Sequence, residues 1–169
     1  MIFVGIDPGL SGAVAALDRK GKVIGVWDTP TIVAKKGKSK KRAYLPMEMV
    51  QIFHNTLLCD IAIVGIEQVH AMPKQGVSSM FRMGEGLGMW EGIIAALALP
   101  MEMVPPIRWK KALLGMGSGA DKGISIARAQ QLISGASKYL ARKKDDGRAD
   151  ALLIALYFLR RSQDGWGCK

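Results

Sequence analysis

Long apolar runs are missing from this 169-residue sequence, and cysteine is scarce. Even a long apolar stretch such as Ile93–Met101, which contains Pro100, falls far short of the roughly 20 residues that a helix needs to cross a bilayer. Cys59 and Cys168 lack the spacing of metal ligands or of a disulfide framework, which fits a reducing compartment. The first residues carry no basic stretch ahead of their apolar run, unlike a secretory signal. We therefore expect a cytoplasmic protein with no membrane partner.

Acidic residues are also in deficit. Fourteen Asp and Glu stand against 24 Lys and Arg, which gives a net charge of +10 and a pI of about 9.8. This excess attracts polyanions and favours nucleic acid as the partner, although a basic surface can also serve solubility alone. Because 49% of the residues are hydrophobic, the whole chain (1–169) can form one domain around a single core.

The order of apolar segments predicts an α/β fold: a mixed central sheet with helices on both faces. Three short apolar runs separated by turn residues predict an antiparallel meander, and the wholly apolar run 61–66 predicts a buried strand. A further strand is expected at 101–104. Ser78 or Ser79 and Asp121 are the predicted caps of two of the helices. The expected helices are 46–58, 78–97, 105–115, 121–134 and 148–161.

Small residues recur every fourth position in the second expected helix, at Gly84, Gly88, Gly92 and Ala96. This spacing places them on one flat ridge along the helix. Charged residues on the same helix argue against a membrane dimer. The ridge therefore suits close packing, and we expect it inside the core rather than at a subunit interface.

Two acidic residues stand where expected strands end. Asp7 follows the first strand directly before Pro-Gly, and Glu67 follows the buried strand 61–66. If these strands are neighbours, the two carboxylates lie side by side. Such a pair is unfavourable unless a cation or a shared proton lies between them.

Further carboxylates open the last expected helix. The segment KKDDGRAD supplies Asp145, Asp146 and Asp150, of which the last two can share a helix face. Taken singly, Asp7 can be a turn residue, and Asp145 or Asp146 can simply cap the helix. Taken together, the acids form the all-oxygen ligand set of a hard cation such as Mg²⁺, which points to phosphodiester hydrolysis.

Three segments carry a resemblance to a known family. The opening around Asp7, IVGIEQV with Glu67 and RADALLIALY with Asp150 resemble the RuvC-type Holliday-junction resolvases, within the ribonuclease H-like superfamily. The resemblance implies a homodimer that cuts four-way junction DNA with symmetric paired nicks, using two Mg²⁺ ions per site, or Mn²⁺ in their place. Several segments look closer to the phage and plastid members, which suggests a phage origin.

One position departs from the bacterial members. Those carry an acid or a histidine three residues before the final aspartate, where this chain has Gly147. Asp145 or Asp146 must then supply the missing ligand. The phage and plastid pattern favours Asp145, whereas helical geometry favours Asp146, so both stay in the predicted metal set.

Basic residues are expected to hold the DNA phosphates without reading sequence. The basic residues beside Trp109 are expected to contact phosphates near the metals. The basic stretch, in a loop or hairpin at about 31–44, is expected to contact a junction arm. Phe81 resembles the family's wedge near the crossover, although a core position is the simpler interpretation. The predicted DNA-binding residues are Lys35, Lys36, Lys38, Lys40, Lys41, Arg42, Lys74, Phe81, Arg108, Lys110 and Lys111.

Other functions remain open. A nuclease of the same fold acting on RNA or RNA–DNA hybrids would share the acids, and a catalytically silent junction-binding protein would share the positive charge. An actin-like ATP-binding protein also opens with a strand and an aspartate. It needs two such domains and a second glycine-rich phosphate loop, which this chain lacks, so no nucleotide cofactor is expected.

Overall fold

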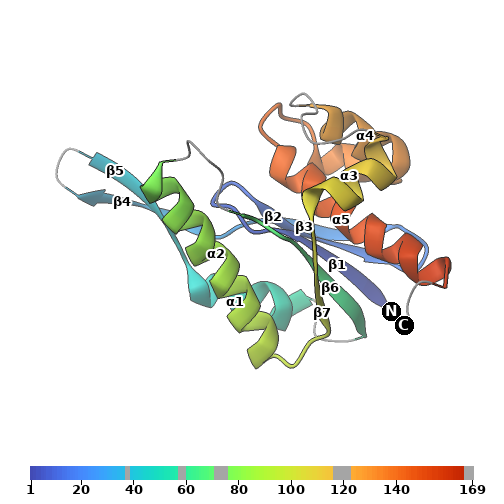
Figure 1. The fold of residues 1–169 in the computed structure, drawn as a ribbon, viewed down its shortest axis with the longest axis horizontal. Coiled ribbons are helices and arrows are strands. Elements are labelled where there is room, and N and C mark those ends of the chain that lie inside the picture. Colours follow the sequence, from blue (N-terminus) through green and yellow to red (C-terminus); the bar gives the residue numbers. More distant parts are fainter. Residues whose placement is uncertain (37–38, 57–59, 71–75, 116–122, 166–169) are drawn as a thin grey trace.

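The computed structural model describes the chain except for residues 37–38, 57–59, 71–75, 116–122 and 166–169 and, for side chains, residues 34–40, 55 and 56. A five-stranded mixed sheet forms its middle layer, with helices on both faces (Figure 1). The predicted α/β fold is confirmed. None of the helices in the described residues combines the length and the apolar character needed to span a bilayer.

The sheet has the strand order β3-β2-β1-β6-β7. The predicted antiparallel meander is confirmed, because β2 pairs with both β1 and β3 in antiparallel fashion. The buried strand β6 pairs with β1 in parallel, and β7 pairs in parallel with β6. The strands are β1 (Ile2–Asp7), β2 (Ala13–Asp18), β3 (Val23–Asp28), β6 (Ile61–Glu67) and β7 (Met101–Val104).

Two hydrophobic cores lie on opposite faces of this sheet. The alternation of a strand sends Phe3 to one core and Val4 and Ile6 to the other. The core around Val4 is covered by α1 (Pro46–Thr56) and α2 (Val77–Ala96). The other is covered by α3 (Pro106–Leu114), α4 (Ile124–Leu132), the short 3₁₀ helix η1 (Ala136–Tyr139) and α5 (Asp146–Gln163).

Helix α5 packs so closely against the centre of the sheet that the strand positions beneath it have no room for a side chain. A Cβ atom at Gly5 would lie 2.1 Å from the Ala151 carbonyl oxygen, and one at Gly65 would lie 2.1 Å from the Phe158 ring. Only glycine permits this approach. It fixes the start of α5 beside the end of β1.

Helix boundaries differ from the expected ones, most clearly at the starts of α2, α4 and α5. Helix α2 begins at Val77 with Gly76 as its N-cap and no side-chain capping bond, so the predicted cap at Ser78 or Ser79 is wrong. Helix α4 begins at Ile124 after Gly123, and Asp121 lies outside the described residues. Helix α5 begins at Asp146, two residues earlier than expected.

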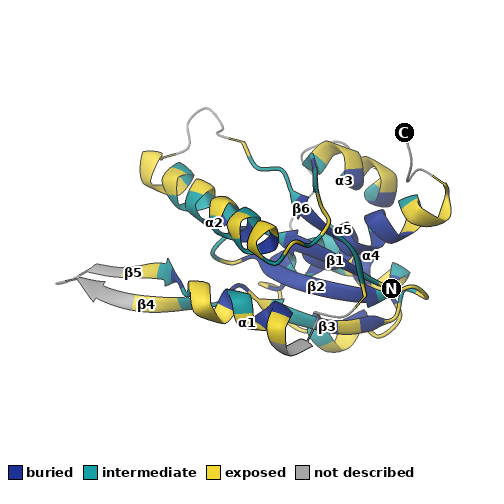
Figure 2. Cartoon of the chain, turned by 90° about the horizontal axis from the view of Figure 1, so that it is seen from below, coloured by how far each residue is buried: buried dark blue, intermediate teal, exposed yellow. Residues whose placement is uncertain are grey.

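The small-residue ridge of α2 faces solvent, which overturns its predicted place in the core. Gly84, Gly88, Gly92 and Ala96 are all exposed, and a Cβ atom at each of the three glycines would meet no atom within 4 Å. The glycine that packs internally is Gly86, where a Cβ atom would lie 2.3 Å from the Tyr44 hydroxyl. The periodic glycines therefore leave one face of α2 open (Figure 2).

The basic stretch forms a β-hairpin, one of the two forms expected for it. Strands β4 (Thr31–Lys36) and β5 (Ser39–Tyr44) pair with each other in a separate two-stranded sheet. The hairpin projects beyond the central sheet on the side where α2 begins (Figures 1 and 2).

Candidate active site

The register of two parallel strands brings Asp7 and Glu67 together. Ile6 of β1 pairs with Ile66 of β6, so the residues that follow them lie next to each other at the same edge of the sheet. Both side chains point to the face that carries α5, because Gly5 and Gly65, two residues earlier, contact that helix. The predicted adjacency of these carboxylates thus follows directly from strand pairing.

The first turns of α5 add Asp146 and Asp150. A Cβ atom at Gly147 would lie 2.4 Å from the Ser11 carbonyl oxygen and 3.0 Å from Asp7 Oδ2. No larger side chain fits there, which gives a physical reason for the glycine that departs from the bacterial pattern. The turn between β1 and β2 fills the space into which a side chain at this position would extend.

The carboxylates of Asp7, Glu67 and Asp150 are coupled electrostatically. Burial, followed by the charges of Glu67 and Asp150, raises the pKa of Asp7 from 3.8 to about 7. Burial and Asp150 also raise the pKa of Glu67. The pKa of Asp150 rises chiefly through burial, with a further contribution from Asp146, against a lowering hydrogen bond from Ser125. Such mutual repulsion favours any cation that binds among these groups.

Helix α3 contributes two groups to the same cluster. The charge of Lys110 lowers the pKa of Asp7, Glu67 and Asp150 alike, so its ammonium group lies within electrostatic reach of all three. Its neighbour Trp109 is fully buried and donates a hydrogen bond from Nε1 to Glu67 Oε1 at 3.1 Å. The indole therefore fixes the orientation of one carboxylate.

Asp145 points away from this cluster. Its carboxylate accepts hydrogen bonds from the Arg142 backbone amide and Nε, both at 2.8 Å, and lies 3.9 Å from Arg148 Nε. Arg148 in turn pairs with Asp28 at the end of β3. Although burial alone would raise the pKa of Asp145, these arginines hold it below its usual value. Asp146, by contrast, lies close enough to Asp150 for its charge to raise the pKa of that carboxyl.

The donor set fits a hard cation. Asp146 Oδ1 and Asp150 Oδ1 are buried without a hydrogen-bond partner among the described residues, and a carboxylate oxygen in that position gains most from a metal ion. In the described part of the chain no three His, Cys, Asp or Glu side chains form a ready-made metal-binding group. Ligation would therefore require side-chain rotation.

The predicted DNA-binding residues fall into separate places. Arg108 and Lys111 are exposed on α3, on either side of Trp109 and Lys110. Lys41 is exposed on the hairpin. Lys35, Lys36 and Lys40 belong to the hairpin strands, but their side chains are not described, and Lys38 and Lys74 lie outside the described residues.

Arg42 is held by neighbouring protein groups. Its guanidinium donates to Ser11 Oγ at 3.0 Å, to the Leu10 carbonyl oxygen at 2.7 Å and to Thr31 Oγ1 at 2.7 Å. These bonds tie the hairpin to the turn that follows Asp7. The role that the structure shows for Arg42 is therefore to attach the hairpin beside the acidic cluster.

Phe81 lies on the surface, where 71% of it is exposed, so the simpler expectation of a core position is wrong. It lines a pocket of about 530 Å³ between the first turns of α2 and the hairpin, together with Val77, Arg82, Lys41 and Arg42. An exposed aromatic flanked by cations can stack on a nucleic-acid base.

A second pocket adjoins the acidic cluster and contains residues that the sequence did not single out. Its volume is about 430 Å³, and Arg142 and Lys144 line it with Asp146 and the turn 10–12. The basic pair in KKDD was the available signal for Lys144. Trp109 and Ser125 were also missed as partners of acids, because nothing in their spacing relates them to Glu67 or Asp150.

Comparison with known proteins agrees with this fold, although no family model matches the chain. Holliday junction resolvase MOC1, chloroplastic, from Chlamydomonas reinhardtii is 33% identical over 100 residues, which is 59% of this chain and 11% of that protein. The chain therefore spans about a tenth of the length of the curated relative that it matches.

Two solved structures match nearly the whole chain. T. thermophilus RuvC in complex with Holliday junction substrate aligns with a TM-score of 0.61 and 18% identity, over 98% of this chain and 96% of that one. The Thermus thermophilus RuvC structure gives a TM-score of 0.56 and 21% identity, over 98% and 97%. The chain has the RuvC fold. The fold that the resemblance of the segments around Asp7, Glu67 and Asp150 implied is thereby confirmed.

Proposed function

We propose that this protein is a metal-dependent DNA endonuclease that resolves four-way junctions. The observation that carries the proposal is the cluster of Asp7, Glu67 and Asp150 at one edge of a RuvC fold. A plastid resolvase with one-third sequence identity and a RuvC structure bound to junction DNA support the choice of substrate.

Asp7, Glu67, Asp150 and Asp146 would hold the metal, for which Mg²⁺ is proposed, as two ions per site, with Mn²⁺ able to substitute. Bound there, divalent ions would activate water and stabilise the leaving oxygen of the phosphodiester. The role of Trp109 is to fix Glu67 from within the core. Asp145 belongs to the arginine network that anchors the start of α5.

The basic groups around the cluster would hold the DNA. Lys110, whose charge acts on the carboxylates, would neutralise a phosphate beside them, and Arg108, Lys111 and Lys144 would extend the positive surface outward. The hairpin and Phe81 form a second contact region on one side of the acids. In this arrangement Phe81 would stack on a base at the centre of the junction.

Symmetric paired nicks require two active sites, and we propose that a homodimer provides them. The exposed ridge at Gly84, Gly88 and Gly92 supports α2 as the contact surface, because glycine lets two backbones approach closely. Light scattering should then give twice the chain mass, and Gly88→Leu should reduce it to that of a monomer.

The test of the activity incubates purified protein with labelled four-way junction, linear duplex and RNA–DNA hybrid, with Mg²⁺, Mn²⁺ or chelator. We expect paired symmetric nicks on the junction alone, and none with chelator. The Asp7→Asn variant should lose cutting by at least about a hundredfold while binding the junction as well as the natural chain, because only metal ligation is impaired. Asp164→Asn makes the same chemical change at an exposed position on the far end of α5 and serves as the control.

Each other outcome has a definite meaning. Cleavage of the hybrid but not of the junction would support the proposed metal site and show that four-way junction DNA is not the substrate. Tight junction binding without cleavage under any metal would identify a silent binding protein. Cleavage that survives Asp7→Asn would remove the acidic cluster from the chemistry.

A further inference from the structure

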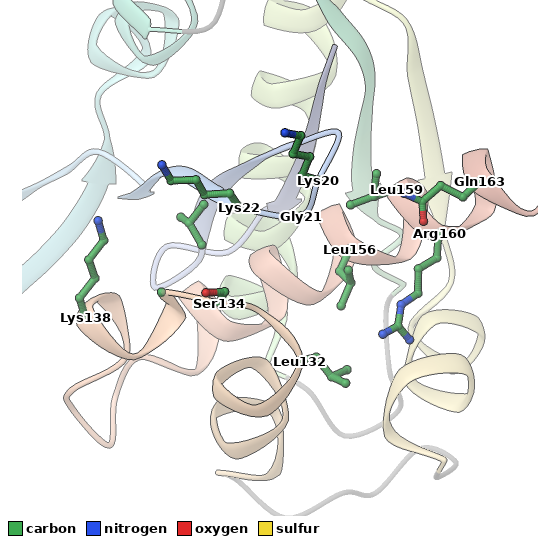
Figure 3. A pocket seen from close by; sticks show the side chains of 12 residues that line it. Lys20, Gly21, Lys22, Leu132, Ser134, Lys138, Leu156, Leu159, Arg160 and Gln163 are labelled. Atoms are coloured by element: carbon green, nitrogen blue, oxygen red, sulfur yellow. The ribbon is translucent and has the colours of Figure 1, made fainter.

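A second basic concavity lies far from the acidic cluster. It has a volume of about 480 Å³, and its rim carries Lys20 and Lys22 from the turn between β2 and β3, Lys138 from η1 and Arg160 from α5. Figure 3 shows these four cations around the leucines of α5 and α4. Three separate parts of the chain therefore contribute positive charge to one pocket.

Two of the cations in this pocket interact with Asp18: hydrogen bonds from the Lys22 and Lys20 backbone amides and the charges of both lysines lower the pKa of that carboxyl. None of the four forms an ion pair within the described part of the chain, and no acidic residue is among those lining the pocket. The nearby Asp18 carboxylate accepts hydrogen bonds from the backbone amides of Lys20 and Lys22. It therefore holds the turn in place and leaves the lysine side chains exposed.

The floor of the pocket is aliphatic. Val23, Leu132, Leu156 and Leu159 line it, and no aromatic residue is among the described lining residues. Proteins that bind single-stranded nucleic acid use aromatic side chains as stacking platforms, so this floor does not suit a base. An aliphatic floor within a cationic rim matches a ligand that carries aliphatic groups beside carboxylates.

The position of the pocket separates it from the catalytic edge. The turn between β2 and β3 lies at the opposite end of the sheet from Asp7, because Asp18 of β2 pairs with Ile2 of β1. Arg160 follows Asp150 by ten residues of α5, which corresponds to about 15 Å along the helix axis. A ligand in this pocket would leave the acidic cluster accessible to DNA.

We propose that this pocket, at the junction of the β2–β3 turn, η1 and the end of α5, binds an acidic peptide segment of a partner protein. An aliphatic side chain of the peptide occupies the floor, and its flanking carboxylates meet the four cations. The chemistry is that of short peptide motifs that anchor one apolar residue and gain selectivity from charge at the rim. Such a contact would recruit the nuclease to a protein already present on DNA.

The test uses the full chain and a fluorescently labelled peptide in which a single leucine is flanked by aspartates, with binding followed by anisotropy. We expect saturable binding that falls at least about fivefold for Lys22→Glu and for Arg160→Glu, since each reverses one rim charge. Arg19→Glu is the matched control, because Arg19 lies in the same turn, is exposed and does not line the pocket. It should change binding by less than about twofold, and all three variants should cut junctions at the rate of the natural chain.

Three results would overturn the proposal. An equal loss of binding in Arg19→Glu and Lys22→Glu would indicate general charge attraction. Equal binding of a peptide with alanine in place of leucine would show that the aliphatic floor is not used. Displacement of the peptide by an unlabelled oligothymidylate, with direct oligonucleotide binding that depends on Lys22, would assign the pocket to nucleic acid.

Discussion

At the scale of single residues, two adjacent aspartates have opposite surroundings. Asp145 is enclosed by Arg142 and Arg148, whereas Asp146 has a buried oxygen without a partner among the described residues. We expect Asp145→Asn to lower the free energy of unfolding by about 1–3 kcal/mol, because it weakens a buried charged network. Asp146→Asn should not lower the free energy of unfolding, because its charge repels Asp150, and should reduce cutting at least about tenfold. Thermal denaturation and junction cleavage of both variants, assayed well below their melting temperatures, separate the two effects.

The two variants serve as controls for each other, since the chemical change is identical. If Asp145→Asn abolished cutting without loss of stability, Asp145 would be a metal ligand and would have to leave the arginine network. That result would agree with the expectation from the resemblance to phage and plastid members, which favours Asp145.

The sequence identifies some of these residues and not others. Asp7 and Glu67 are predictable as neighbours because each ends an apolar strand, and strand pairing then determines their positions. The choice between Asp145 and Asp146 is not predictable in this way. It depends on where Arg142 and Arg148 direct their side chains, which is a property of the folded loop.

At the scale of elements, the distance between α5 and the sheet controls the site, because α5 carries Asp146 and Asp150. Gly5→Ala should lower the free energy of unfolding by several kcal/mol, since its Cβ atom would lie 2.1 Å from the Ala151 carbonyl oxygen and would force α5 outward. The control is Gly88→Ala on the exposed ridge, where a Cβ atom meets nothing within 4 Å in the same chain, and both variants are compared at protein concentrations low enough to keep the chain monomeric. That change should stabilise the chain by about 0.5–1 kcal/mol through helix propensity. Urea denaturation measures both, and equal effects would show that α5 tolerates displacement.

The same glycines show which features of an element its sequence can predict. The period of four along α2 identifies a smooth ridge, but periodicity does not reveal whether the ridge faces the core or solvent. Gly86, which lies off that period, is the glycine that contacts Tyr44. Similarly, the spacing of Phe81 suits a core position, yet the hairpin and α2 leave it exposed. These orientations depend on which neighbours cover a helix.

At the scale of the whole molecule, charge is distributed unevenly over a basic protein. The chain carries +10 overall, yet Asp7, Glu67 and Asp150 gather at one edge of the sheet, with Asp146 close to Asp150. The repulsion among these acids opposes folding wherever they are ionised. A divalent cation would relieve it, so the free energy of unfolding and metal binding should be linked.

This linkage predicts how stability depends on pH. The pKa of Asp7 rises from 3.8 to about 7 in the folded chain, so between these values the folded state holds a proton that the unfolded state has released. Stability therefore decreases as pH rises from about 4 to 7 and stays low above that range. Asp7→Asn should remove this penalty. Because Asp7 is only half-buried, the gain at pH 8 should be on the order of 1–2 kcal/mol, or roughly 4 °C in melting temperature.

Melting curves at pH 8 and pH 5, recorded in chelator, test this expectation. The gain from Asp7→Asn should be clearly smaller at pH 5, where folded Asp7 is already protonated, and Asp164→Asn should show no gain at either pH. Adding Mg²⁺ at pH 8 should raise the melting temperature of the natural chain more than that of Asp7→Asn, because the variant has lost one carboxylate ligand. An equal gain at both pH values would mean that the ionised Asp7 carboxylate does not oppose folding. The stabilisation would then have to come from an uncharged contact of the new asparagine.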